Sequence, residues 1–169
     1  MDVWISIKGV QHADGESSSL ELSTLGFMER TEDGFNITYE ESETTGMKGV
    51  TTSMIVNPSA ITLKRQGAFN SIMVLEKGKR TICNYDTEFG SMMMGVYAQD
   101  IRYSLAERGG DFDFHYTLDI NSGMAFAHDV YVSVRAAQPE RQADAKRRRK
   151  VVRCRKKSRS KGEKSICLK

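Results

Sequence analysis

Five polar side chains lie on segments in which apolar and polar residues alternate: Tyr39, Glu41, Arg65, Tyr85 and Tyr116. Alternation with a period of two is typical of strands, whose successive side chains point to opposite faces. If the apolar faces of these strands line a barrel, the five side chains converge as polar groups in a mostly apolar cavity, which is the composition of ligand pockets. We predict that they bind a small ligand. The alternative is a cluster in which an arginine–carboxylate pair satisfies itself at one end of a packed barrel.

A second group, Asp111, Asp113 and His115, places potential metal ligands about 7 Å apart along one strand face. Carboxylate and imidazole suit several divalent ions. The residues between them are phenylalanines, so we expect the acidic face of this strand to point to water. The three histidines of the chain show no zinc-type spacing such as His-Glu-x-x-His. We therefore predict no metal site.

Signatures of catalysis or of a cofactor are not visible. Cys83 has no neighbouring histidine or cationic helix end that would lower its pKa, so we interpret it as a small buried hydrophobe. His128 falls on the apolar face of the last strand, where we predict a hydrogen-bonded core histidine. The glycine-rich turns match neither the phosphate loop G-x-x-x-x-G-K-[ST] nor a G-x-G-x-x-G that opens a helix. We predict no catalytic residue, no cofactor and no enzymatic activity.

Basic residues concentrate at the C-terminal end. Residues 1–134 hold 10 Lys and Arg against 19 Asp and Glu, a net charge of −9, whereas residues 135–169 hold 15 against 3, a net charge of +12. Basic segments of this kind neutralise nucleic-acid phosphates. The segment has no Phe, Tyr or Trp on which bases could stack, so we expect weak, sequence-independent and salt-dependent contact with RNA or DNA. The predicted contact residues are Lys146, Arg147, Arg148, Arg149, Lys150, Arg153, Arg155, Lys156 and Lys157.

This change in charge divides the chain into a predicted β domain, residues 1–135, and a polybasic tail, residues 136–169. The tail carries like charges and little apolar surface, so we expect it to be disordered on its own. Residues 137–157 are rich in Ala, Gln, Arg and Lys and are expected to become helical on a polyanion. The alternative is a solvated extension that touches the acidic body.

The segments that must position these residues are short strands joined by turns. Val3, Ile5 and Ile7 alternate with polar residues in the first of about ten such segments, which follow one another at near-regular spacing. Residues 12–19 are expected to form a polar turn between the first two strands. Many short strands separated by Gly, Asn, Asp and Ser predict an all-β meander. Closing the sheet on itself buries its apolar face and removes exposed edges, so an antiparallel barrel is our first prediction and a two-sheet sandwich the second.

The remaining composition indicates a cytoplasmic protein. The N-terminal residues have neither a basic nor an apolar leader region and enter a strand directly. No run of about 18 apolar residues is present, so we predict no membrane span and no membrane partner. Three cysteines without regular spacing suit a reducing compartment better than a disulfide framework.

An ordered set of short motifs resembles the YwiB-like family of small bacterial proteins. The set begins with Tyr39-Glu40-Glu41 and with Gly46-Met47-x-Gly49 followed by two threonines. Arg65-x-Gly67, Ser71-x-Met73 and Tyr85-x-Thr87 with Phe89-Gly90 follow in the same order, and Glu88 stands where the family pattern leads us to expect proline. The likeness covers roughly residues 3–135. It implies a lipocalin-like (calycin) β-barrel and, because the family is one of unknown function, no activity.

Two functional hypotheses follow. The first is a non-enzymatic, lipocalin-like barrel that binds a small ligand or a protein partner. The alternative is a nucleic-acid-associated accessory protein that contacts phosphates through its basic tail. An enzyme ranks third, because no nucleophile–base pair or metal-ligand spacing is visible in the sequence.

Overall fold

The computed structural model describes residues 1–87, 90–120 and 123–137, with side chains 84–91 and 124 outside the description. The described residues form ten strands and one short 3-10 turn, η1 (Glu43–Thr45). The strands are β1 (Asp2–Ala13), β2 (Glu16–Arg30), β3 (Phe35–Glu40), β4 (Val50–Val56), β5 (Ala60–Gly67), β6 (Ser71–Glu76), β7 (Arg80–Thr87), β8 (Gly90–Ala106), β9 (Gly109–Ile120) and β10 (Met124–Ala136). Within this described part, no helix has the length and apolar character needed to cross a membrane.

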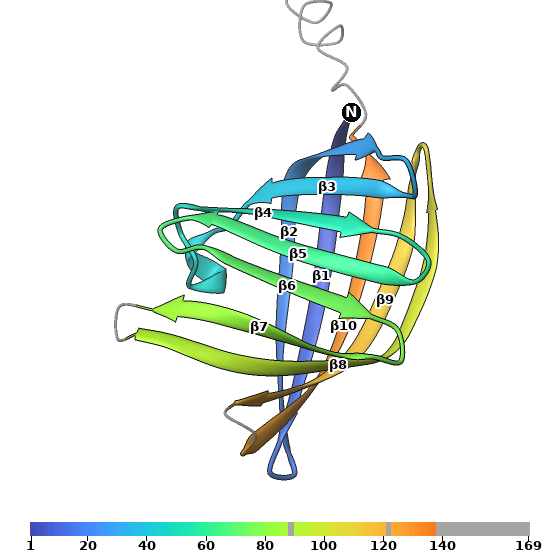
Figure 1. Cartoon of the computed structure of the whole chain (residues 1–169). Coiled ribbons are helices and arrows are strands. Elements are labelled where there is room, and N and C mark those ends of the chain that lie inside the picture. The colour runs from blue at the N-terminus through green and yellow to red at the C-terminus, as the bar shows by residue number, and fades with distance from the viewer. Residues whose placement is uncertain (88–89, 121–122, 138–169) are drawn as a thin grey trace, which may run out of the picture. The chain divides into compact units, whose positions relative to one another are not determined.

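The strands follow one another around a closed barrel. Each strand pairs with its neighbours in sequence, and β1 closes the sheet by pairing with β10, from Val3 opposite Ala136 to His12 opposite Ala127. Figure 1 shows β1 in blue beside β10 in orange, with β3 to β8 crossing them at a steep angle. The prediction of a single antiparallel meander barrel is confirmed, and the two-sheet sandwich is wrong. Of the predicted tail, residues 136–169, only residues 136 and 137 are among the described residues.

The connection between β1 and β2 is shorter than the sequence pattern predicted. Pairing continues to Ala13 opposite Glu16, so only Asp14 and Gly15 form the turn. Both have positive φ, 50° and 82°, as a two-residue hairpin turn requires, and Asp-Gly is a favoured pair there. The expected eight-residue polar turn is therefore wrong, because its polar residues occupy two strands that extend past the core.

Strict alternation places the core inside the barrel. In β3, Phe35, Ile37 and Tyr39 are buried while their neighbours are more exposed, as the sequence pattern predicted. Phe112 and Phe114 of β9 are 2% exposed and face the same interior. The largest fully buried side chains are Phe112, Phe114, Ile5, Ile37, Ile61 and Leu75. Burial of these apolar side chains is the main contribution to the stability of the barrel.

The ladder between β6 and β7 is the weakest in the barrel. These two strands share a single paired position, Ser71 opposite Tyr85, whereas β5 pairs with β6 at six positions. Part of the missing ladder is replaced by the Thr81 hydroxyl, which donates to the carbonyl oxygen of Val74. We call this junction the β6–β7 seam. Backbone groups along it lack the regular partners that other strands have.

The seam predicts an uneven pattern of amide hydrogen exchange. Amides of β6 and β7 that face each other should exchange before those of β1, β9 and β10, because fewer ladder bonds must break to expose them. Exchange followed by mass spectrometry on peptides covering each strand measures this order. Equal protection of β6 and β1 would show that the ladder at the seam is complete.

Candidate functional site

The barrel interior contains a small cavity of about 140 Å³. Its wall is largely apolar, with Ile7, Leu22, Met54, Leu63, Phe114 and Val130 contributing side chains from six strands. Four polar side chains of the predicted set line the same cavity: Tyr39, Glu41, Arg65 and Tyr116. The structure therefore brings together four of the five residues selected from sequence. The side chain of the fifth, Tyr85, lies outside the described residues.

The strand register explains why these residues meet. Tyr39 of β3 is opposite Thr52 of β4, and Thr52 is opposite Arg65 of β5. Arg65 is in turn opposite Ser71 of β6, whose partner on β7 is Tyr85. Directly opposite residues in an antiparallel sheet point to the same face. One row of inward positions across the four strands β3 to β6 is therefore unusually polar.

Glu41 is a buried carboxylate held by two hydroxyl groups. It is 7% exposed, and it follows the last residue of β3. Thr52 Oγ1 donates to Glu41 Oε1 at 2.7 Å, and Thr45 Oγ1 donates to Oε2 at 2.8 Å. The turn η1 brings Thr45 back over the strand end and closes at Gly46, whose φ of 71° is left-handed. The carboxylate thus has hydrogen-bond donors that the protein itself supplies.

Arg65 lacks such partners. Its Nε atom is buried without a hydrogen-bond acceptor. Among the described residues its guanidinium forms no hydrogen bond or ion pair, so it does not form the arginine–carboxylate pair that the self-satisfied alternative requires. A buried donor without an acceptor costs about 1–3 kcal/mol, and more when it is charged. The cavity therefore holds an uncompensated donor that an acceptor from outside the chain can satisfy.

The two tyrosines in the cavity are neutral hydrogen-bonding groups. Burial raises the pKa of Tyr39 above its usual value, and the Glu41 carboxylate raises it further, whereas Arg65 acts in the opposite direction. Burial likewise raises the pKa of Tyr116 to about 12, again opposed by Arg65. Both phenols remain protonated at neutral pH; the Tyr39 phenol is hydrogen-bonded with Glu41 and Thr52, and the Tyr116 phenol can donate to a ligand.

His128 supports the ring of Tyr116 by stacking. The two rings lie 4.8 Å apart at 9°. Burial lowers the pKa of His128, which favours the neutral imidazole. Among the described residues no hydrogen bond to this imidazole is found, and the hydrogen-bonded core histidine stays a prediction.

Gly9 is the residue that sequence reasoning missed. It continues the inward row of Val3, Ile5 and Ile7 on β1 and lines the cavity. A Cβ atom built on Gly9 would have no heavy atom within 4 Å. The cavity thus exists partly because an inward position carries no side chain. The signal was available in the sequence, since the alternation from Val3 to Ile7 places position 9 on the interior face.

A second hollow of about 500 Å³ lies along the β6–β7 seam. Ile72 and Ile82, which are 55% and 61% exposed, form its outer edges. Arg65 and Cys83 also line it, although both belong to inward rows. Arg65 is therefore shared between the hollow at the seam and the interior cavity.

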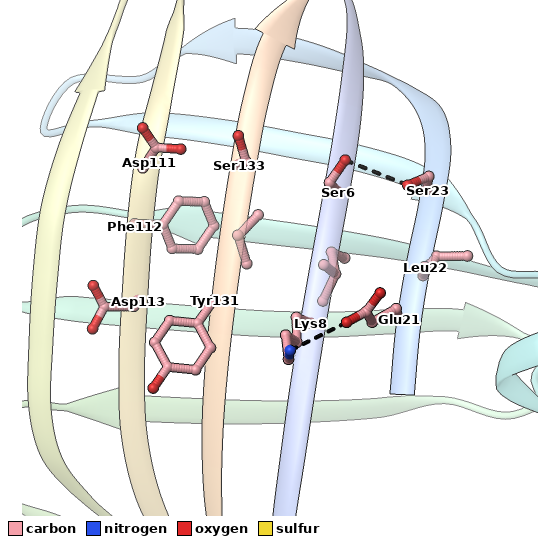
Figure 2. A pocket seen from close by; sticks show the side chains of 12 residues that line it. Ser6, Lys8, Glu21, Leu22, Ser23, Asp111, Phe112, Asp113, Tyr131 and Ser133 are labelled. Atoms are coloured by element: carbon pink, nitrogen blue, oxygen red, sulfur yellow. Dashed lines mark hydrogen bonds and ion pairs between the residues drawn. The ribbon is translucent and has the colours of Figure 1, made fainter. Parts of the chain in front are cut away.

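The outer face of β2, β1, β10 and β9 carries a shallow groove of about 440 Å³ (Figure 2). Figure 2 shows the hydroxyl groups of Ser6 and Ser23 hydrogen-bonded between β1 and β2, with the Lys8–Glu21 ion pair, 3.2 Å, on the same two strands. Asp111 at its edge binds Arg135 at 2.9 Å, which holds the pKa of that carboxyl below its usual range. The charged groups of this groove already have partners, Lys8 with Glu21 in the groove and Asp111 and Asp113 with side chains outside it, so the groove offers little to an ion.

The Asp/His face of β9 is outside the barrel, as predicted, and its side chains bind one another. His115 Nδ1 and Asp129 Oδ1 are 2.6 Å apart, and His115 Nε2 lies 3.1 Å from Asp113 Oδ1. His12 Nε2 lies 3.0 Å from the other oxygen of Asp129. The hydrogen bond with His115 is the largest cause of the lowered pKa of Asp129. In the described part of the chain, no three His, Cys, Asp or Glu side chains are placed to hold a metal ion.

The predicted nucleic-acid contacts lie outside the described residues. They are Lys146, Arg147, Arg148, Arg149, Lys150, Arg153, Arg155, Lys156 and Lys157. The described chain ends at Ala137, whose amide donates to the carbonyl oxygen of Asp2 at 2.9 Å. Phosphate binding by the tail stays a prediction from charge.

The raised pKa of Tyr116 predicts a loss of stability in alkali. The folded state favours the protonated phenol, so this stabilisation is complete below pH 10 and is lost as the pH rises towards 12. Tyr116→Phe removes the titrating group and keeps the ring. Between pH 9 and pH 12, the free energy of unfolding of the wild type should fall by on the order of 2 kcal/mol more than that of the variant. Denaturant titrations at each pH measure both, and parallel losses would contradict the buried phenol.

Comparison with known proteins places this barrel in a family. Residues 5–131 match the family described as "Domain of unknown function (DUF1934)". The uncharacterized β-barrel protein YwiB of Bacillus subtilis (strain 168) is 22% identical over 131 residues, which cover 78% of this chain and 91% of the relative. The crystal structure of the B. subtilis ywiB protein matches with a TM-score of 0.69 at 20% identity, over 81% of this chain and 92% of that one. The expected YwiB-like resemblance is confirmed, and the chain belongs to the DUF1934 family of β-barrel proteins of unknown function.

Proposed function

We propose that this barrel is a non-enzymatic protein that binds a small ligand in its interior cavity. The observation that carries the proposal is Arg65, a cation with a buried, unsatisfied Nε at the wall of an apolar cavity. Burying an N–H donor without an acceptor is unfavourable, and a ligand that supplies an acceptor offsets this cost. Glu41, Tyr39 and Tyr116 add further polar groups that can orient the ligand.

The chemistry of the cavity favours binding over catalysis. A base or nucleophile needs a pKa suited to accept or lose a proton near neutral pH. Tyr39, Tyr116 and the nearby Cys83 thiol all have their pKa raised by burial, so each stays protonated. The free Cys83 also agrees with the reducing cytoplasm in which we expect the protein to act.

Filling the cavity tests this function directly. Gly9→Leu places a side chain where a Cβ meets no atom within 4 Å, so the fold should tolerate it. Replacing glycine also reduces the entropy of the unfolded chain, by about 0.4–1 kcal/mol in the Gly→Ala case. Purified wild type should release a small molecule on denaturation, detected by mass spectrometry, and Gly9→Leu should release none.

Gly9→Ala is the matched control, since it makes the same backbone change and leaves most of the cavity open. It should retain the released molecule. Equal release from Gly9→Leu and the wild type would show that the molecule sits elsewhere. A wild type that releases nothing and binds no added small molecule would refute the proposal.

A second candidate function rests on the charge of the C-terminal segment, which is +12 over residues 135–169 against −9 over residues 1–134. Truncation after Ala137 removes the predicted contact residues and keeps β10 and its last hydrogen bond to Asp2. The truncated chain should lose retention on immobilised RNA at low salt, while its thermal transition stays nearly unchanged. Retention equal to that of the full chain would refute phosphate binding by the tail.

A further inference from the structure

We propose that the ligand of the cavity is a small monocarboxylate whose carboxylate is bound by Arg65. This inference rests on the proposed function and specifies the chemical class that the site accepts. Arginine presents a planar fork of N–H donors that matches the two oxygens of a carboxylate. The buried Nε of Arg65 is a donor without an acceptor, and the described residues supply no carboxylate to pair with it.

The other polar groups of the cavity favour an anion with one charge. Each carboxylate oxygen of Glu41 already accepts a hydrogen bond, from Thr45 or from Thr52, so Glu41 does not require a donor from the ligand. Its carboxylate lines the same cavity and repels a second negative charge, so a dianion such as phosphate would be bound less well. Tyr116 remains neutral and can donate to the same carboxylate, whereas the Tyr39 phenol is already hydrogen-bonded with Glu41 and Thr52.

The volume and the wall of the cavity limit the rest of the ligand. A volume of about 140 Å³ holds about five water molecules at roughly 30 Å³ each, or a ligand with a similar number of heavy atoms. Met54, Leu63 and Phe114 provide an apolar surface for a short hydrocarbon part. A carboxylate with two or three carbon atoms fits both the charge and the space.

The position of Arg65 also gives the carboxylate a route to the guanidinium. Arg65 lines both the interior cavity and the hollow at the β6–β7 seam. Ser71 of β6 and Cys83 of β7 also line this hollow, although both occupy inward positions of their strands. Because β6 and β7 share one paired position, the strands can separate there with little loss of ladder bonding.

Titration with sodium propionate and with its neutral isostere propionamide tests the proposal. Binding is followed by backbone amide NMR at pH 7 and constant ionic strength, on the full chain. The wild type should bind propionate with a Kd on the order of 1 mM, as expected for a ligand of five heavy atoms, and propionamide and inorganic phosphate at least about tenfold more weakly. Arg65→Gln should remove the preference for propionate, and Arg65→Lys should restore part of it.

Two further variants distinguish failure of the monocarboxylate proposal from failure of the proposed ligand-binding function. Arg102→Gln removes a surface arginine on β8 that is 68% exposed and should leave propionate binding unchanged. Gly9→Leu should remove the binding of every ligand. Three outcomes would overturn the proposal that the ligand is a monocarboxylate and would still leave a cavity that binds a ligand. They are equal affinity for propionate and propionamide, unchanged propionate binding in folded Arg65→Gln, and tighter binding of phosphate than of propionate. Absence of binding by all probes, with no molecule released from the purified protein, would overturn both.

Discussion

Closure of β1 onto β10 is the constraint on which the rest of this structure depends. A closed sheet has one interior, so every second side chain of all strands must fit into the same space. Apolar side chains such as Phe112 and Ile37 pack in this interior without needing a hydrogen-bond partner. A polar side chain at an inward position must find a partner there or remain unsatisfied. Glu41 finds two threonine hydroxyls, whereas Arg65 finds no partner among the described residues.

The same constraint explains where the cavity forms. Phe114 and Leu63 line the cavity, whereas Gly9, which is opposite Val130 in the same cross-strand row as Phe114, contributes no side chain. Glu41 cannot move into the remaining space without leaving Thr45 and Thr52. The cavity is therefore bounded by an absent side chain and by a carboxylate that its hydrogen bonds hold in place. A leucine at position 9 would occupy this space, because a Cβ atom there meets no heavy atom within 4 Å.

Much of this arrangement could be predicted from the sequence, because strand alternation fixes which face each residue joins. The rows Phe35-Ile37-Tyr39-Glu41 and Phe112-Phe114-Tyr116 were placed inside the barrel on that ground, and the structure has them there. The register between strands was not predictable, since it depends on turn lengths such as the two-residue Asp14–Gly15 turn. Without the register, two features could not be foreseen: the lack of an ion pair between Arg65 and Glu41, and the single paired position at the β6–β7 seam.

The central claim is that Arg65 faces an open cavity and needs an acceptor from outside the chain. A high-resolution crystal structure of the purified protein measures this most directly. We expect density for a small molecule or ordered water within hydrogen-bonding distance of the Arg65 guanidinium, with Glu41 hydrogen-bonded to Thr45 and Thr52. An Arg65 side chain that forms an ion pair with Glu41, in an interior filled by side chains, would contradict it.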